Sequence, residues 1–282
     1  MRKLALLACC ATLLLGCSPK ERESQAEIVV SIAPLKYIVE RIIGDDFRIG
    51  VLVPANTSPE TYDPTPRDII SLNNAQMVFS TGLIEFENAL LGKVSDKQSV
   101  VNLHEGIELI AGSCSHSHCN HAHGVDPHIW LSPRELRTMS RNAHTAIMCL
   151  YPDSVHYTSA YNALDEELAA LDEECRTRCE ASSADAFVIY HPALTYYARA
   201  YSLEQIAIES DGKEPSAKHI AGIIARAKQQ QHAACLLYQS EFPRSVVEVI
   251  AKDMGIEPIE INPLAENPVA FIREVTKTIT KK

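Results

Sequence analysis

The chain has 282 residues and a formal net charge of −10 at pH 7, and 46% of its residues are hydrophobic. This acidic balance argues against nucleic acid as a partner. The length is sufficient for two α/β domains with hydrophobic cores of their own, and no segment after residue 16 is apolar enough to cross a membrane.

The first residues are typical of a bacterial secretory signal. Two basic residues precede an apolar run at 4–15, which is too short to span a bilayer core of about 30 Å. The run ends in the phrase LLGC, which resembles a lipobox, so we expect residues 1–16 to be a signal peptide and Cys17 to be lipidated. The polar residues 17–26 would then be a lipid-anchored tether. An ordinary secreted protein with an incidental cysteine is the alternative.

Strands and helices are predicted to alternate in the next part of the chain. Short β-branched or apolar runs predict strands, and apolar residues at helical spacing predict helices. In chain order we expect strands at 26–34, 47–53, 75–80 and 99–103, and helices at 35–43, 67–74 and 132–150. This alternation predicts a mostly parallel sheet whose functional loops follow the carboxyl ends of the strands.

A long amphipathic helix is predicted to start at 154 and to end near 180. It is longer than one small domain needs, so we expect it to connect two lobes. After it the alternation repeats, with strands at 186–190, 204–209, 233–238 and 257–261 and helices at 193–201, 218–230, 245–254 and 268–279. We therefore predict an α/β protein with a mostly parallel sheet flanked by helices in each lobe, divided into an N-terminal lobe at 27–152, a connecting helix at 153–180 and a C-terminal lobe at 181–282.

Histidines are concentrated in one stretch, because five of the eleven lie between residues 114 and 133. Neutral imidazole is a common ligand of zinc, and a thiolate is another. The part at 114–123 has no apolar periodicity and reads as a solvated loop, so its ligands would be weak and accessory: His116, His118, Cys119, His121 and His123. His128 differs, because a proline precedes it and an apolar run that can be buried follows it.

Several phrases resemble, in their order along the chain, the cluster A-I substrate-binding proteins of bacterial ABC transporters, which carry zinc or manganese. The phrases are SIAPLKYIVERI, PANTSPETYDPTPRDI, DPHIWLSP, YHPALTYYARAY, KEPSAKHI and YQSEFPRSVVEVIA. The resemblance covers nearly the whole chain after the tether. It implies two α/β lobes joined by one rigid helix, a metal held between the lobes and delivery to an ABC permease in the cytoplasmic membrane. We accordingly expect a monomeric lipoprotein in the periplasm or at the cell surface.

The resemblance also implies a set of metal ligands. His128 and His191 stand where the family has its second and third ligands, and we expect both to lie at strand-to-loop junctions. A histidine in the third place resembles the zinc-carrying members. Glu60 stands in place of the first ligand, which is normally histidine, and Asn262 stands where an aspartate is frequent. One carboxylate, two neutral imidazoles and an amide or a water would leave Zn²⁺ with the same net charge as three imidazoles and one carboxylate.

Other interpretations stay open at this point. Mn²⁺ or Fe²⁺ is the alternative cargo, because carboxylate and amide oxygens are harder ligands than imidazole. A surface lipoprotein that buffers metal or acts as an adhesin would have no cognate permease. A zinc hydrolase uses similar ligands with an open position, but the sequence has no HExxH motif, so we expect no enzyme activity.

Two further groups of residues complete the predictions. Cys175 and Cys179 lie four residues apart on one face of a helix, which is an awkward geometry for a disulfide, so we expect free thiols. Four side chains on loops are expected to border the cleft and to support the ligands without binding metal themselves: Glu209, Asp211, Gln239 and Glu241.

Overall fold

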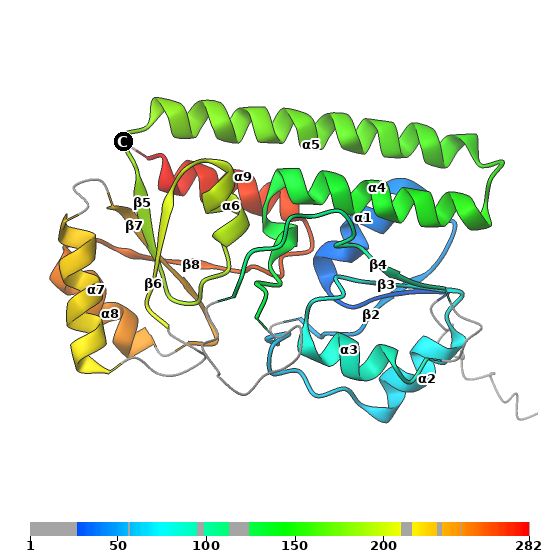
Figure 1. Ribbon diagram of the computed structural model, residues 1–282, viewed down its shortest axis with the longest axis horizontal. Helices are drawn as coiled ribbons and strands as arrows, with labels where there is room; N and C mark the ends of the chain where they lie inside the picture. Colours follow the sequence, from blue (N-terminus) through cyan, green and yellow to red (C-terminus); the bar gives the residue numbers. More distant parts are fainter. Residues whose placement is uncertain are drawn as a thin grey trace, which may run out of the picture.

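Two parallel four-stranded sheets, each flanked by helices, make up the protein (Figure 1). The computed structural model describes residues 27–55, 57–94, 99–112, 124–209, 216–229, 233–242 and 244–281. The strand orders are β2-β1-β3-β4 and β6-β5-β7-β8, so the second sheet repeats the topology of the first. The predicted fold class is confirmed.

The N-terminal lobe surrounds the first sheet. Its strands are β1 (Ile28–Val30), β2 (Ile49–Val51), β3 (Met77–Ser80) and β4 (Ser99–Asn102), and its first helices are α1 (Ala33–Ile43), α2 (Pro66–Asn74) and α3 (Glu85–Leu91). The central strands β1 and β3 are buried along their whole length, which explains why they appear as unbroken apolar runs. The sequence analysis named no element in the region of α3, because its seven residues are too few for a clear helical period.

The C-terminal lobe surrounds the second sheet. Its strands are β5 (Ala186–Ile189), β6 (Glu204–Ala207), β7 (Ala233–Gln239) and β8 (Pro258–Ile261), and its helices are α6 (Thr195–Ala200), α7 (Ala217–Gln229) and α8 (Arg244–Met254). One face of β5 packs with α7 and α8, through side chains such as Val188 and Ile250. The other face, which carries Phe187 and Ile189, belongs to a core that continues into the N-terminal lobe.

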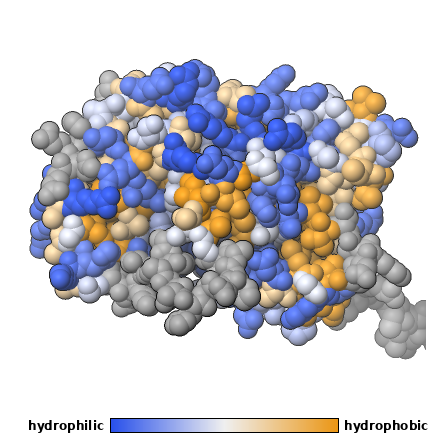
Figure 2. Space-filling view, viewed as in Figure 1, coloured by the Kyte–Doolittle hydropathy of each residue, from blue (hydrophilic) through white to orange (hydrophobic). Residues whose placement is uncertain are grey.

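Three helices bind the lobes together: α4 (Pro133–Leu150), α5 (Val155–Ala181) and α9 (Pro268–Ile279). With 27 residues, α5 is about 40 Å long and runs along both lobes (Figure 1). It packs on α1 and α4 near its start and on α9 near its end. Its buried stripe of Leu164, Leu168 and Leu171 faces this shared core, and hydrophilic residues predominate along its outer edge (Figure 2). The predicted connecting helix is therefore present.

The two cysteines on α5 are free, as expected. Both are also buried. The Cys175 Sγ lies 3.2 Å from the Thr276 Oγ1 of α9, and burial raises the pKa of the Cys175 thiol to about 11. Because the thiolate is the reactive form, these groups are inert packing residues at the junction of α5 with α9.

Some predictions concern residues outside those that the structure describes. These are the signal peptide at 1–16, the tether at 17–26 with Cys17, and the His-rich loop at 114–123. Among the described helices, none combines the length and the apolar character that a membrane span requires.

Candidate metal centre

Glu60 lies in the proline-rich loop that leads from β2 to α2. The loop is anchored at its far end, where Asp68 Oδ2 accepts hydrogen bonds from the backbone N–H of Thr65 (2.6 Å) and from the Tyr62 hydroxyl (2.8 Å). The Tyr62 ring in turn packs edge-on against Phe86 at 5.2 Å between centroids. These contacts fix the end of the loop next to α2, and the prolines restrict its backbone. The Glu60 side chain remains 39% exposed.

His128 is held by a carboxylate of its own segment. Asp126 Oδ1 accepts from the His128 backbone N–H and lies beside His128 Nδ1, both at 2.9 Å. The imidazole also contacts the ring of Trp130, at 5.2 Å between centroids. The Trp130 indole N–H donates to the Pro263 carbonyl oxygen of the other lobe at 2.8 Å, so the segment that carries His128 is tied to the β8–α9 loop.

The expectation that His128 follows a strand is wrong. The residue directly precedes η1 (Ile129–Leu131), a single 3-10 turn that is fully buried. A short buried apolar run has no periodicity that distinguishes a strand from a turn. Here Pro133 starts α4 immediately afterwards, at a helix position that suits proline, so the run has no room to extend as a strand.

His191 lies two residues after the end of β5, at a strand-to-loop junction as expected. Gln239 at the end of β7 clamps its backbone, because the amide oxygen accepts from the His191 N–H (3.3 Å) and the amide nitrogen donates to the His191 carbonyl (3.1 Å). The ring is stacked on Phe242 at 5.8 Å between centroids, and its Nδ1 lies 2.7 Å from Glu209 Oε2. His191 is therefore fixed at its backbone, at its ring face and at one ring nitrogen.

The three side chains converge between the lobes. Glu60 Oε1 lies 3.1 Å from His191 Nε2 and 3.9 Å from His128 Nε2, and one potential ligand atom of each residue lies within 4.8 Å of the others. Four ligands at about 2.0 to 2.1 Å from a tetrahedral zinc ion are about 3.3 Å apart. The trio is thus close to the spacing that a zinc ion requires before any metal is bound.

A pocket of about 130 Å³ opens onto this trio. Asn262 lines its wall, and the Asn262 Oδ1 accepts a hydrogen bond from the Leu264 backbone N–H at 3.0 Å. An amide oxygen has a second lone pair, so Asn262 keeps one acceptor site that could face a metal. The exposed carboxylates of Glu241 and Glu260 also line the pocket.

Most of the predicted supporting residues also lie here. Glu209 and Gln239 contact His191, and Glu241 lines the pocket, whereas Asp211 is outside the described residues. The sequence analysis missed the roles of Asp126, Trp130 and Phe242. For Asp126 a signal was available, because an Asp side chain readily accepts from the backbone N–H two residues later, as Asp126 does here from His128.

The electrostatics of the trio follow from these contacts. Burial acts to raise the pKa of the Glu60 carboxyl, but the hydrogen bond and charge of His191 outweigh it and hold the pKa below its usual range. Burial acts to lower the pKa of His191, but the hydrogen bonds to Glu209 and Glu60 outweigh burial and raise the pKa to about 10. Without metal, the imidazole therefore holds a proton between two carboxylates, and a cation that binds at Nε2 takes the place of that proton.

Comparisons with known proteins identify the family to which the chain belongs. The family described as zinc-uptake complex component A periplasmic matches residues 28–282. The chain is 26% identical over 279 residues to the zinc-binding lipoprotein AdcA of Streptococcus pneumoniae serotype 4, a match that covers 94% of this chain and 56% of AdcA, so that it spans only about half of that relative. It is 27% identical over 284 residues to the high-affinity zinc uptake system protein ZnuA of Bacillus subtilis, which covers 93% of this chain and 88% of ZnuA.

Solved structures of similar fold include a protein that is also named ZnuA. A crystal structure of a ZnuA deletion mutant with zinc bound is 30% identical to this chain and superimposes with a TM-score of 0.81, covering 91% of this chain and 97% of the other. Since the family match extends over both lobes and the connecting helix, the chain belongs to the zinc-uptake complex component A periplasmic family.

Proposed function

We propose that this protein binds one Zn²⁺ ion between its lobes through Glu60, His128 and His191, and delivers it to an ABC permease for import. The observation that carries the proposal is the convergence of these three donors, with Glu60 Oε1 at 3.1 and 3.9 Å from the two Nε2 atoms. Two imidazoles and one carboxylate are an accepted zinc set. Asn262 or a water molecule completes the tetrahedron.

The proposed donors come from both lobes, which couples binding to the arrangement of the lobes. Glu60 and His128 belong to the N-terminal lobe, whereas His191 and Asn262 belong to the C-terminal lobe. The lobes also share α5 and the hydrogen bond from Trp130 to Pro263. A continuous helix bends less readily than a pair of strands, so uptake and release need only a small opening of the pocket.

The cellular setting is proposed on the same grounds. The relatives are named as zinc-binding lipoproteins and zinc uptake components, and the start of the chain resembles a lipoprotein signal. We place the protein outside the cytoplasmic membrane, in the periplasm or at the cell surface, as a monomer anchored through Cys17. A metal-buffering lipoprotein or adhesin would bind zinc equally well without a permease.

A binding role fits the site better than catalysis does. The two buried carboxylates nearest to the imidazoles, Asp126 and Glu209, each contact a histidine Nδ1. Each is therefore engaged in orienting a ligand and is not placed as a general base beside an open metal position.

Metal analysis tests the proposal most directly. Protein purified without added metal should contain about one zinc ion per chain and little manganese or iron. Titration against a chelator should then show a loss of about 100-fold or more in zinc affinity for His128→Ala and for His191→Ala, because about 10 to 16 kcal/mol shared among four ligands is about 3 kcal/mol for each.

The matched control is His156→Ala, which removes an exposed histidine on α5 whose ring lies beside Asp46. Its zinc affinity should equal that of the unchanged protein. A protein rich in manganese would make Mn²⁺ the cargo, and zinc affinity that is indifferent to both ligand substitutions would refute the site.

A further inference from the structure

Among the described residues, Glu209 is one of two buried carboxylates, with Asp126, that contact a proposed histidine ligand without being ligands themselves. It follows β6 by two residues, and its backbone N–H donates to the Tyr190 carbonyl at 2.9 Å, which continues the pairing of β6 with β5. Its side chain is only 8% exposed. Burying a carboxylate is costly unless hydrogen bonds or opposite charges compensate for it, so this placement calls for a compensating partner.

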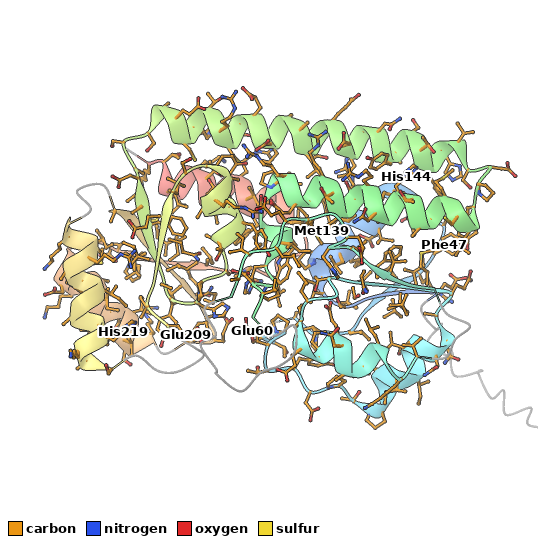
Figure 3. The ribbon with its side chains drawn as sticks, viewed as in Figure 1. Phe47, Glu60, Met139, His144, Glu209 and His219 are labelled. Carbon is orange, nitrogen blue, oxygen red and sulfur yellow. The ribbon has the colours of Figure 1, made fainter. Side chains whose placement is uncertain are left out.

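That partner is His191. Glu209 Oε2 lies 2.7 Å from His191 Nδ1, a distance typical of a charge-assisted hydrogen bond, and Figure 3 shows Glu209 beside Glu60 between the lobes. Because Glu209 accepts a hydrogen from Nδ1, the lone pair that remains for a metal is on Nε2. This is the nitrogen that faces Glu60 Oε1 at 3.1 Å.

Apart from Glu60, which faces Nε2 and is itself a proposed ligand, the other contacts of His191 do not select a ring nitrogen. Gln239 hydrogen-bonds only to the His191 backbone. Phe242 stacks on the ring face, and stacking is equally compatible with a ring turned by half a rotation about its Cβ–Cγ bond. Among the described contacts that are not proposed ligands, Glu209 is thus the one that decides which nitrogen points into the pocket.

We infer that Glu209 is the positioning residue for the C-terminal-lobe ligand, which it holds in the tautomer and orientation that present Nε2 to the cargo metal. This inference rests on the proposed function, since it requires His191 to bind metal. Asp126 has the corresponding position at His128, but it lies two residues away in the same segment, whereas Glu209 comes from a different segment, the loop that follows β6. The negative charge of a carboxylate beside Nδ1–H also makes the imidazole more basic, so that Nε2 donates its electron pair to a metal more strongly.

A series of variants at Glu209 separates orientation from charge. Glu209→Gln keeps an oxygen that can accept from Nδ1–H but removes the charge, whereas Glu209→Leu removes both. Partners of this kind typically account for about 10-fold to 100-fold in metal affinity. We expect about 10-fold weaker zinc binding for Glu209→Gln and about 100-fold for Glu209→Leu, so that the amide restores part of what leucine loses.

The matched control is Glu204→Gln, the same exchange at the start of β6. Glu204 forms an ion pair with Arg226 far along the strand from His191, so zinc affinity should be unchanged. The visible spectrum of Co²⁺-loaded protein is a second measurement: Glu209→Gln should still bind one Co²⁺ but with shifted bands, because a ligand has changed its donor strength. The thermal midpoint of metal-free protein reports any loss of folding separately.

The outcomes are distinct. If the unchanged protein binds no zinc, or if His191→Ala has no effect, the proposed function fails before Glu209 is tested. If zinc binding depends on His191 but Glu209→Gln and Glu209→Leu bind as tightly as Glu204→Gln, the positioning role is overturned. Should Glu209→Leu fail to fold, Glu209→Gln with its cobalt spectrum decides the matter, and an unshifted spectrum with unchanged affinity refutes the inference.

Discussion

Moving the carboxylate from position 60 to position 262 by mutation is the most demanding test of the proposed site. In the proposed site Glu60 supplies the carboxylate, and Asn262 lies on the wall of the same pocket, where an aspartate would supply one instead. Glu60→His should weaken zinc binding, because it leaves Zn²⁺ with its full charge of +2 and no anionic protein ligand. Adding Asn262→Asp should restore most of that affinity.

The expected magnitude follows from the size of the site. Potential ligand atoms of Glu60, His128 and His191 lie within 4.8 Å of one another, and Asn262 lines the same pocket. Two unit charges about 4 Å apart interact by about 4 kcal/mol at an effective dielectric constant of about 20. In the Glu60→His variant, a hydroxide or chloride ion bound to the zinc would offset much of this lost interaction energy. We therefore expect a coupling free energy on the order of 1 kcal/mol or more between the two substitutions.

Calorimetric titration against a competing chelator measures all four corners of this cycle. Asn262→Asp retains the oxygen that accepts from the Leu264 N–H, so the β8–α9 loop should keep its conformation and the comparison should report on the metal. Additive effects would show that residue 262 lies outside the coordination sphere, and Glu60 would then need another explanation.

Three further predictions concern pH, the His-rich loop and the connecting helix. Zinc affinity measured by competition should fall about tenfold per pH unit from pH 9 to pH 7. His191, with its pKa raised to about 10, stays protonated below that value and must lose a proton to solvent when the metal binds. An affinity independent of pH would contradict this. Deleting residues 114–123 should remove only the weakly bound zinc ions from a titration, because ordering such a loop costs about 1 to 2 kcal/mol per residue and so lowers its affinity. Loss of the tightly bound zinc ion would make the loop a primary source of ligands. Leu168→Ala should lower the free energy of unfolding, measured by denaturant titration, by about 2 to 5 kcal/mol, because Leu168 is buried in the core that joins the lobes. A change below about 1 kcal/mol would show that α5 is not part of that core.

Much of the fold was predictable because its elements carry clear local patterns. The helix at 268–279 was predicted with the bounds that the structure has for α9, since Asn267 caps it and a proline begins it. The limits of α5 were predicted to within one or two residues from its apolar stripe. In contrast, α3 and the turn at 129–131 were not predicted, since seven residues or fewer give no reliable period.

The candidate site was likewise predictable in part. The sequence by itself determined which residue types are available for metal and in what order they occur, because Glu60, His128 and His191 stand in short phrases that resemble those of a known family. Only the tertiary structure decided that their ligand atoms lie within 4.8 Å of one another and that the Glu209 carboxylate reaches His191 from the end of β6. The physical reason is that sequence periodicity shows only which face of a helix or strand is buried. Whether loops from two lobes come together depends on how α4, α5 and α9 pack the lobes around one shared core.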